Sequence, residues 1–204
     1  MTPVDEYDER YVHALEPLQA ILKEHLEGVL EGVERIDFIS VRAKHPTSFA
    51  GKCRKRDGRG KLKYSDPIRQ VTDQIGARVV VYYASDVGKV VRILKQYLRY
   101  VEDEEKSPAS ESEFGYFGRH LLFRLPADVL EDSLSGLYPD FFELQVKTLF
   151  QHAWSQAHHG IGYKNKHELT LDERRKMALS AAQAWGSDGI FNELASQECE
   201  DVSG

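Results

Sequence analysis

Cysteine is scarce in this chain of 204 residues, and long apolar runs are absent. Cys53 and Cys199 stand far apart and no CxxC pair occurs, so the sequence predicts two reduced thiols and no disulfide framework. No apolar run approaches the ~20 residues of a membrane-spanning helix, and the N-terminus is acidic, unlike a signal peptide. We therefore expect a cytoplasmic protein without a membrane partner.

The phosphate-binding pattern GxxxxGK[ST] is also absent, and the net charge of −6 disfavours a general nucleic-acid binder. The charge is nevertheless uneven. Residues 42–63 hold nine Lys or Arg against Asp57 alone, whereas residues 101–113 hold six acids against Lys106. A basic segment in an acidic protein favours a local anionic ligand, with a solvated basic loop as the alternative.

Apolar periodicity predicts an α+β fold in a single domain, residues 1–204, with a core over about 36–164. An amphipathic helix is expected over 6–34, with Pro17 as a point where it kinks. The acidic stretch 101–113 and residues 126–140 are expected to be loops. The other predicted strands lie at 36–42, at 77–83, at 121–125 and from 141. The other predicted helices are a short one capped by Thr47 or Ser48, one at 87–98, one that ends at 164, and one at 170–194.

The stretch from Phe141 to Lys164 carries the strongest chemical pattern. Its first residues alternate, so Glu143, Gln145 and Lys147 share one strand face, and three apolar side chains share the other. An acid, an amide and a base in register are more typical of a cleft than of a core. Histidines on the following helix suggest zinc, but no third ligand beside His152 and His159 has convincing spacing.

A second pattern predicts a phosphate site. The 36–42 strand ends in Arg42 and leads to Lys44, and a short helix then places Ser48 and Lys52 four residues apart on one face. By itself, Asp73 is interpreted as a cap or turn residue before the 77–83 strand. Tyr116, close to two glycines, is free to stack on a base or to pack at a strand end.

Taken together, these motifs resemble the synthetase domain of RelA/SpoT-type alarmone synthetases, over about residues 36–164, in the size of a small single-domain member. Each motif alone is weak, and the resemblance rests on their order along the chain. The matching pieces are Val41-Arg42-Ala43-Lys44 with Ser48, Lys52 and Lys55; Asp73 to Arg78; Gly115-Tyr116 with His120; Glu143 to Thr148; Ala153-Trp154; and Tyr163-Lys164.

The resemblance implies a nucleotidyltransferase-like mixed sheet flanked by helices. It implies transfer of the β,γ-pyrophosphate of ATP to the 3′-hydroxyl of GDP or GTP, which yields AMP and (p)ppGpp, the signal of the stringent response. Two acids, Asp73 and Glu143, would hold Mg²⁺, and Glu143 would hold it or take the hydroxyl proton. The remaining implied roles are adenine stacking by Arg42 and Arg78; ATP phosphate binding by Lys44, Ser48, Lys52 and Lys55; base stacking by Tyr116; and acceptor binding by His120, Gln145, Lys147 and His152.

Two departures from the family pattern concern the acceptor. The region before Gly115-Tyr116 reads SPASESEF, with acids where the synthetases carry a proline-lysine pair, and only the ends of the run from Tyr116 to His120 match. The alternatives left open are a toxin that pyrophosphorylates the 3′-terminal adenosine of tRNA, with an antitoxin partner, and a degenerate nucleotide-binding regulator. The sequence does not give the oligomeric state.

Overall fold

The computed structural model describes residues 2–105, 118–164 and 169–201. Its centre is a five-stranded mixed sheet in the order β1-β2-β5-β4-β3. The parallel pair β2–β5 lies in the middle, and the other neighbouring strands are antiparallel. This confirms the predicted α+β class. The strands are β1 (Ile36–Ala43), β2 (Ile75–Val81), β3 (Tyr100–Glu105), β4 (Arg119–Arg124) and β5 (Phe141–Thr148).

The two faces of the sheet differ in chemistry. On one face, register aligns Val41, Ala77, Leu144 and Leu121, and these apolar side chains belong to the core. On the other face, the same register aligns polar residues across all five strands, in the order Ser40, Arg78, Gln145, His120 and Glu104. Alternation along a strand puts neighbouring residues on opposite faces, which explains how one sheet carries both rows.

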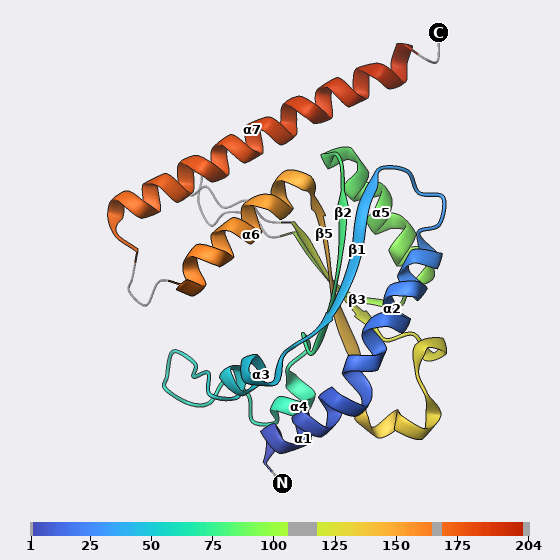
Figure 1. Cartoon of the computed structure of the whole chain (residues 1–204), viewed down its shortest axis with the longest axis vertical. Coiled ribbons are helices and arrows are strands. Elements are labelled where there is room, and N and C mark those ends of the chain that lie inside the picture. The colour runs from blue at the N-terminus through green and yellow to red at the C-terminus, as the bar shows by residue number, and fades with distance from the viewer. Residues whose placement is uncertain (1, 106–117, 165–168, 202–204) are drawn as a thin grey trace.

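Helices cover the apolar face, and Figure 1 shows α2 (Glu16–Val29) and α5 (Ala84–Tyr97) on this side of the sheet. Leu18, Leu22 and Leu26 of α2 are fully buried at helical spacing, as the amphipathic pattern predicts. Val90, Val91 and Leu94 do the same for α5. This packing fixes the sheet from behind and leaves its polar face toward the remaining helices.

The polar face lies between two groups of helices on the other side of the sheet (Figure 1). One group contains α6 (Leu149–Lys164), which follows β5 directly, and α7 (Leu171–Asp201), which packs on α6. The other group contains α3 (Pro46–Cys53) and the short α4 (Pro67–Gln70), beside α1 (Pro3–Arg10). None of the described helices combines the length and apolarity needed to cross a membrane.

The N-terminal helix differs from the single helix expected over residues 6–34. It consists of α1, a π-helical turn over Tyr11–Leu15, and α2. Within the π turn, the amide of Glu16 donates to the carbonyl of Tyr11, five residues earlier. Pro17 follows at once and has no N–H to donate, so the predicted irregularity at this proline is a widened turn.

Two local expectations were wrong, and the loop expected over residues 126–140 contains short helical turns. The cap of α3 is His45, whose Nδ1 accepts from the amide of Thr47, with Pro46 in the first turn in place of a Thr47 or Ser48 cap. The acidic residues 101–105 form an edge strand rather than a loop, since charged side chains suit an exposed edge. Residues 126–140 include two 3₁₀ segments, Ala127–Val129 and Asp132–Leu137.

The C-terminal helix begins as expected. Thr170 and Glu173 exchange the two hydrogen bonds of a capping box. The helix continues to Asp201, beyond the expected end at residue 194. Apolar periodicity fades before that point, but residues such as Glu193, Leu194 and Ala195 retain good helix propensity, and no glycine or proline interrupts the last turns.

Candidate active site

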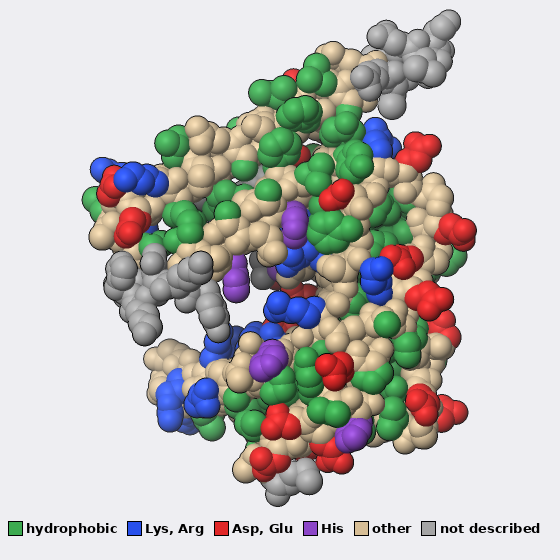
Figure 2. Space-filling view, in the orientation of Figure 1, with side chains coloured by type: hydrophobic (Ala, Val, Ile, Leu, Met, Phe, Trp, Pro, Cys, Tyr) green, Lys and Arg blue, Asp and Glu red, His purple; other side chains and the backbone are tan. Residues whose placement is uncertain are grey.

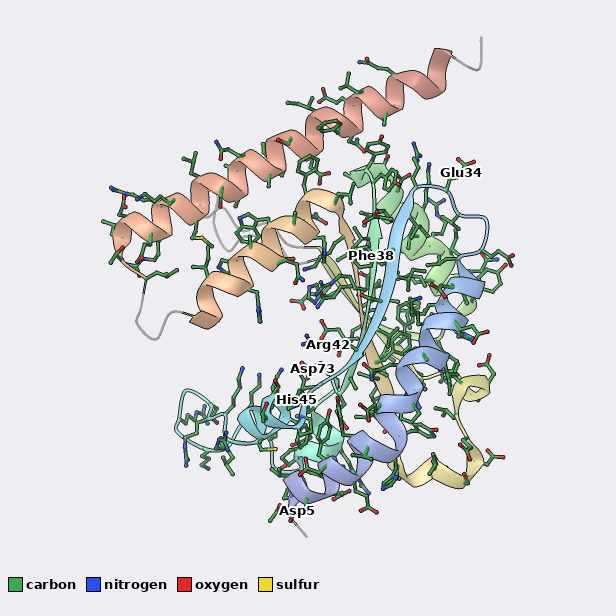
Figure 3. All side chains as sticks on the ribbon, in the orientation of Figure 1. Asp5, Glu34, Phe38, Arg42, His45 and Asp73 are labelled. Atoms are coloured by element: carbon green, nitrogen blue, oxygen red, sulfur yellow. The ribbon has the colours of Figure 1, made fainter. Side chains whose placement is uncertain are left out.

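A cavity of about 490 Å³ opens on the polar face of the sheet. Figure 2 shows Lys, Arg and His side chains around a hollow on this face. Figure 3 shows Arg42 and Asp73 on the same side of β1, facing the space between α3 and α6. Asp73 and Glu143 both line the cavity, so the structure brings together the two acids that the sequence singles out. The volume of this cavity is that of a pocket for a small ligand.

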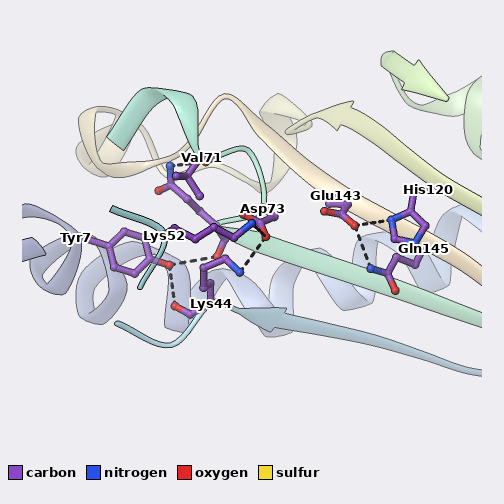
Figure 4. Close-up of polar contacts among 9 residues, drawn as sticks. Tyr7, Lys44, Lys52, Val71, Asp73, His120, Glu143 and Gln145 are labelled. Carbon is purple, nitrogen blue, oxygen red and sulfur yellow. Dashed lines mark hydrogen bonds and ion pairs between the residues drawn. The ribbon is translucent and has the colours of Figure 1, made fainter. Parts of the chain in front are cut away.

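Asp73 is held by two lysines. Its Oδ2 lies 2.9 Å from Nζ of Lys44, at the end of β1, and 3.0 Å from Nζ of Lys52, on α3 (Figure 4). Burial alone lowers the pKa of Lys52, but the hydrogen bond to Asp73 and the charges of Asp73 and Glu143 more than offset this, and the pKa is raised. Lys52 therefore keeps its positive charge beside both acids.

Glu143 is held by side chains of the sheet itself. Its Oε1 lies 2.8 Å from Nδ1 of His120 and 3.0 Å from Nε2 of Gln145 (Figure 4). Gln145 stands two residues along β5, and His120 is its cross-strand partner on β4. The strand register thus orients the carboxylate, as the alternation in the sequence predicts.

Arg78 enters the cavity from β2 and is held by α6. Its guanidinium lies 3.2 Å from Nδ1 of His152 and 3.5 Å from Oε1 of Gln156. Burial and the nearby charge of Arg42 lower the pKa of Arg78. Burial, Arg78 and Lys147 lower the pKa of His152, so its ring is neutral and accepts from Arg78. Arg42 and Arg78 both line the cavity, and Arg42 pairs in register with Gly76, two residues before Arg78 on the same strand face.

Two buried polar atoms of the cavity lack a hydrogen-bond partner within the described ranges: Nε of Arg78 and Oε1 of Gln145. A buried donor or acceptor without a partner costs free energy, on the order of 1–3 kcal/mol. One atom donates and the other accepts, and both belong to residues that line the cavity. Unsatisfied polar atoms in two lining residues are more typical of a functional site than of a surface that serves packing alone.

The acids fit a hard divalent ion. Mg²⁺ takes one or two protein carboxylates and completes its shell with phosphate oxygens and water. Asp73 already binds positive charge, from two ammonium groups, and Glu143 lines the same cavity. Among the described residues, no cluster of three His, Cys, Asp or Glu exists that would form an all-protein site. The donor set therefore suits Mg²⁺ carried with a nucleotide better than zinc.

Lys147 and His152 lie at the α6 side of the site. Nζ of Lys147 donates to Oγ of Ser155 at 3.1 Å, and only 7% of the residue is exposed. Gly118, immediately before β4, packs over Lys147, and a Cβ there would lie 2.6 Å from the carbonyl oxygen of Val146. Only glycine allows this close approach. The neighbouring Tyr116 lies outside the described residues.

The remaining predicted residues divide into two groups. Arg42, Lys44, Arg78 and Gln145 line the cavity, and Lys52 and His120 contact its acids. Ser48 and Lys55 are exposed and are not among the residues lining the cavity. Their phosphate-binding role stays a prediction.

Sequence reasoning missed some residues of the site. Ser40 and Gln156 line the cavity. Their signals were available, since Ser40 shares a strand face with Arg42 and Gln156 stands one helical turn after His152. Tyr7 and Arg10 of α1, which donate hydrogen bonds to Lys44 and Gln74, lie within the helix predicted over 6–34, and no local pattern distinguishes them.

The profile of the region found in RelA/SpoT proteins matches residues 41–168 of this chain. The chain belongs to this family. The matched segment contains both cavity acids, the lysines bound to Asp73 and the whole of β5. The GTP pyrophosphokinase YjbM of Bacillus subtilis is 26% identical over 153 residues, which cover 72% of this chain and 65% of that protein. The match thus spans less than two thirds of the curated relative.

Solved structures share the fold of this RelA/SpoT family member. A GTP pyrophosphokinase family protein from Streptococcus pneumoniae superposes with a TM-score of 0.75 and 22% identity, over 96% of each chain. The small alarmone synthetase 1 of Bacillus subtilis, bound to its product pppGpp, gives 0.73 and 22%, over 93% of this chain and 96% of that one. The same synthetase bound to AMPCPP gives 0.73 and 19%, over 96% and 99%.

Proposed function

We propose that this chain is a pyrophosphokinase that moves the β,γ-pyrophosphate of ATP to the 3′-hydroxyl of a guanine nucleotide, GDP or GTP. The products would be AMP and (p)ppGpp. The observation that carries the proposal is the meeting of Asp73 and Glu143, distant in the sequence, at one cavity with Lys44 and Arg78. The names of the relatives agree, since YjbM is called a GTP pyrophosphokinase and small alarmone synthetase 1 was solved with pppGpp and AMPCPP.

ATP would bind on the side of β1 and β2. The flat guanidinium groups of Arg42 and Arg78 suit stacking on adenine, and burial of Arg78 strengthens such a contact by removing water. Lys44 and Lys52 would bind the triphosphate, because charge-assisted bonds to phosphate oxygens are among the stronger polar contacts. Mg²⁺, held by Asp73, would add positive charge at the phosphate oxygens where negative charge develops.

The transfer itself requires loss of one proton. The 3′-oxygen of the acceptor forms a bond to the β-phosphorus, and the bond from that phosphorus to the α,β-bridging oxygen breaks, so that AMP leaves. Glu143 would take the hydroxyl proton as the general base, which typically contributes 10²–10⁴-fold to the rate. Its hydrogen bonds from His120 and Gln145 fix the direction of the carboxylate.

The acceptor would bind on the side of β4 and β5. His120 and Gln145 would contact its ribose or phosphates, Lys147 and His152 would contribute from the α6 side, and Tyr116 would stack on the base. The row of polar residues continues from His120 to Glu104 on β3, so this end of the face is less positive than the ATP end. The acceptor must therefore be identified by experiment with each candidate.

The test mixes the protein with Mg²⁺, ATP labelled in its β-phosphate, and GDP, GTP or deacylated tRNA in separate reactions. The proposal predicts AMP release and label on the guanine nucleotide. Label on tRNA would establish the toxin activity instead, and absence of AMP with every acceptor would favour a nucleotide-binding regulator. Glu143→Gln is expected to lower the transfer rate by a factor on the order of 10³ with ATP binding retained. Substantial turnover in this variant would refute the role of Glu143 as base.

A further inference from the structure

Backbone hydrogen bonds join the end of β1, which carries Lys44, to the loop that carries Asp73. The amide of Lys44 donates to the carbonyl of Gln74 at 2.8 Å, which joins the end of β1 to the residue after Asp73. The hydroxyl of Tyr7, on α1, donates to the carbonyl of Lys44 at 2.7 Å and lies 3.4 Å from the carbonyl of Gln74. Figure 4 shows Tyr7 beside Lys44, with Asp73 on the other side of the two lysines. One phenol thus contacts the backbone on both sides of the lysine–aspartate pair.

Tyr7 is itself held rigidly. It is fully buried, and its ring stacks on Phe49 of α3, with 3.8 Å between centroids and 5° between planes. The helix that carries Phe49 also carries Lys52, the second cation on Asp73. Tyr7 therefore connects the three segments that bear Lys44, Lys52 and Asp73.

Arg10, one helical turn after Tyr7, holds the same loop through a hydrogen bond to the side chain of Gln74. Its guanidinium donates to Oε1 of Gln74 at 3.0 Å. Nε2 of Gln74 in turn donates to the carbonyls of Ile68 at 2.6 Å and Val71 at 2.9 Å. Arg10 and Gln74 are almost completely buried. A buried polar network with these partners holds one arrangement of the loop.

We propose that Tyr7 is a positioning residue for the transfer reaction, and that its hydroxyl sets the placement of Asp73 against Lys44. The inference rests on the proposed function, since placement of Asp73 matters only if this acid serves the ATP phosphates and their ion. Small displacements of reacting groups cost large factors in rate, because proximity supplies much of the catalysis. Tyr7 and Arg10 lie outside residues 41–168, so the matched family segment depends on a brace from α1.

The experiment compares Tyr7→Phe with the wild-type chain. This change removes the hydroxyl and keeps the ring on Phe49. We expect a three- to tenfold lower kcat and a higher Mg²⁺ concentration at half-maximal rate, with the KM for the acceptor unchanged. We also expect faster amide hydrogen exchange at Lys44, measured by NMR without nucleotide. Arg10→Lys, which keeps the charge but loses the planar contact with Gln74, should change the same quantities in the same direction.

Tyr83→Phe is the matched control. Tyr83 follows β2, whereas Asp73 precedes this strand, and the Tyr83 ring lies 5.4 Å from the guanidinium of Arg35. This variant should leave kcat, Mg²⁺ dependence and Lys44 exchange unchanged. An active wild-type chain with Tyr7→Phe equal to it in all three quantities would overturn the inference. So would equal changes in Tyr83→Phe. An inactive wild-type chain would instead refute the proposed function, and faster Lys44 exchange in Tyr7→Phe would still support the brace.

Discussion

Two aspartates in this molecule each lie between two cations, yet their surroundings differ. Asp73 contacts Lys44 and Lys52 through one oxygen, Oδ2, on the polar face of the sheet. Asp103, on the edge strand β3, uses both oxygens: Arg119 donates to Oδ1 and Oδ2 at 2.7 Å each, and Lys95 also binds Oδ2. Asp103 pairs in register with Leu121, so its side chain lies on the apolar face of the sheet, which α2 and α5 cover.

The difference shows that an acid between two cations is not a site in itself. The forked contact of Arg119 with Asp103 is a complete bidentate pair that joins β3 to β4, while Lys95 ties both to α5. Hydrogen bonds from Arg119 lower the pKa of Asp103 to about 2. Asp73 borders a cavity that also contains Glu143, and its two lysines reach it as single donors from separate segments. An ammonium group has three N–H donors, so each lysine can bind a phosphate oxygen while it keeps its contact with Asp73.

The largest expected effect contrasts the two aspartates directly. Asp73→Asn should lower pyrophosphate transfer by a factor of at least about 10², because it removes charge where the ATP phosphates and Mg²⁺ bind. Asp103→Asn should change the activity per folded molecule less than about threefold. Initial rates at saturating ATP, corrected for the folded fraction by circular dichroism, measure both. Equal losses in the two variants would remove the distinction between them.

A second contrast removes one cation from each pair. Lys52→Ala should raise the KM for ATP about tenfold or more, since a charge-assisted bond to phosphate contributes roughly 1.5–3 kcal/mol. Lys95→Ala, at the Asp103 cluster, should leave that KM unchanged. Steady-state kinetics with varied ATP decides the matter, and an unchanged KM in Lys52→Ala would take α3 out of the phosphate site.

The Asp103 cluster should dominate acid stability. The pKa of Asp103 is depressed in the folded chain. The contribution of Asp103 to the free energy of unfolding is therefore fully present above its pKa in the unfolded chain, about 3.9, and is lost as the pH falls toward about 2. Asp103→Asn should therefore reduce the free energy of unfolding by an amount on the order of 2 kcal/mol at pH 7, and the difference should narrow below pH 4. Urea denaturation at several pH values measures it. A difference independent of pH would contradict the assignment.

The smallest expected effect concerns His152, which together with Gln156 contacts Arg78 through a side chain that carries no negative charge. The pKa of His152 is lowered in the fold, so the unfolded chain takes up the proton first as the pH falls below about 6.5, and this group then disfavours folding. His152→Asn keeps an acceptor for Arg78 and should flatten the decline in stability between pH 7 and pH 5.5. Thermal melts of the two proteins over this range provide the test, with an identical pH dependence as the contrary result.

The strand and helix that carry site residues were predictable where a repeating pattern spans only a few neighbouring residues. The alternation in β5 predicted that Glu143 and Gln145 share a face, and the spacing around Lys52 predicted a helix there, although its cap is His45. The edge strand β3 was missed because its acidic residues have low strand propensity and only pairing with β4 makes it a strand. The support from Tyr7 and Arg10 was missed because their partners are distant in the sequence.

Local spacing and residue chemistry by themselves determined the fold class, the polar face of β5 and the basic segment that would meet an anion. These depend on neighbours within a few positions, where the geometry of helix and strand is fixed. The tertiary structure decided that Asp73 belongs to a cavity and Asp103 to the sheet edge, and that α1 braces the Asp73 loop. Such facts depend on strand order and helix packing, which set the distances between residues that the sequence leaves far apart.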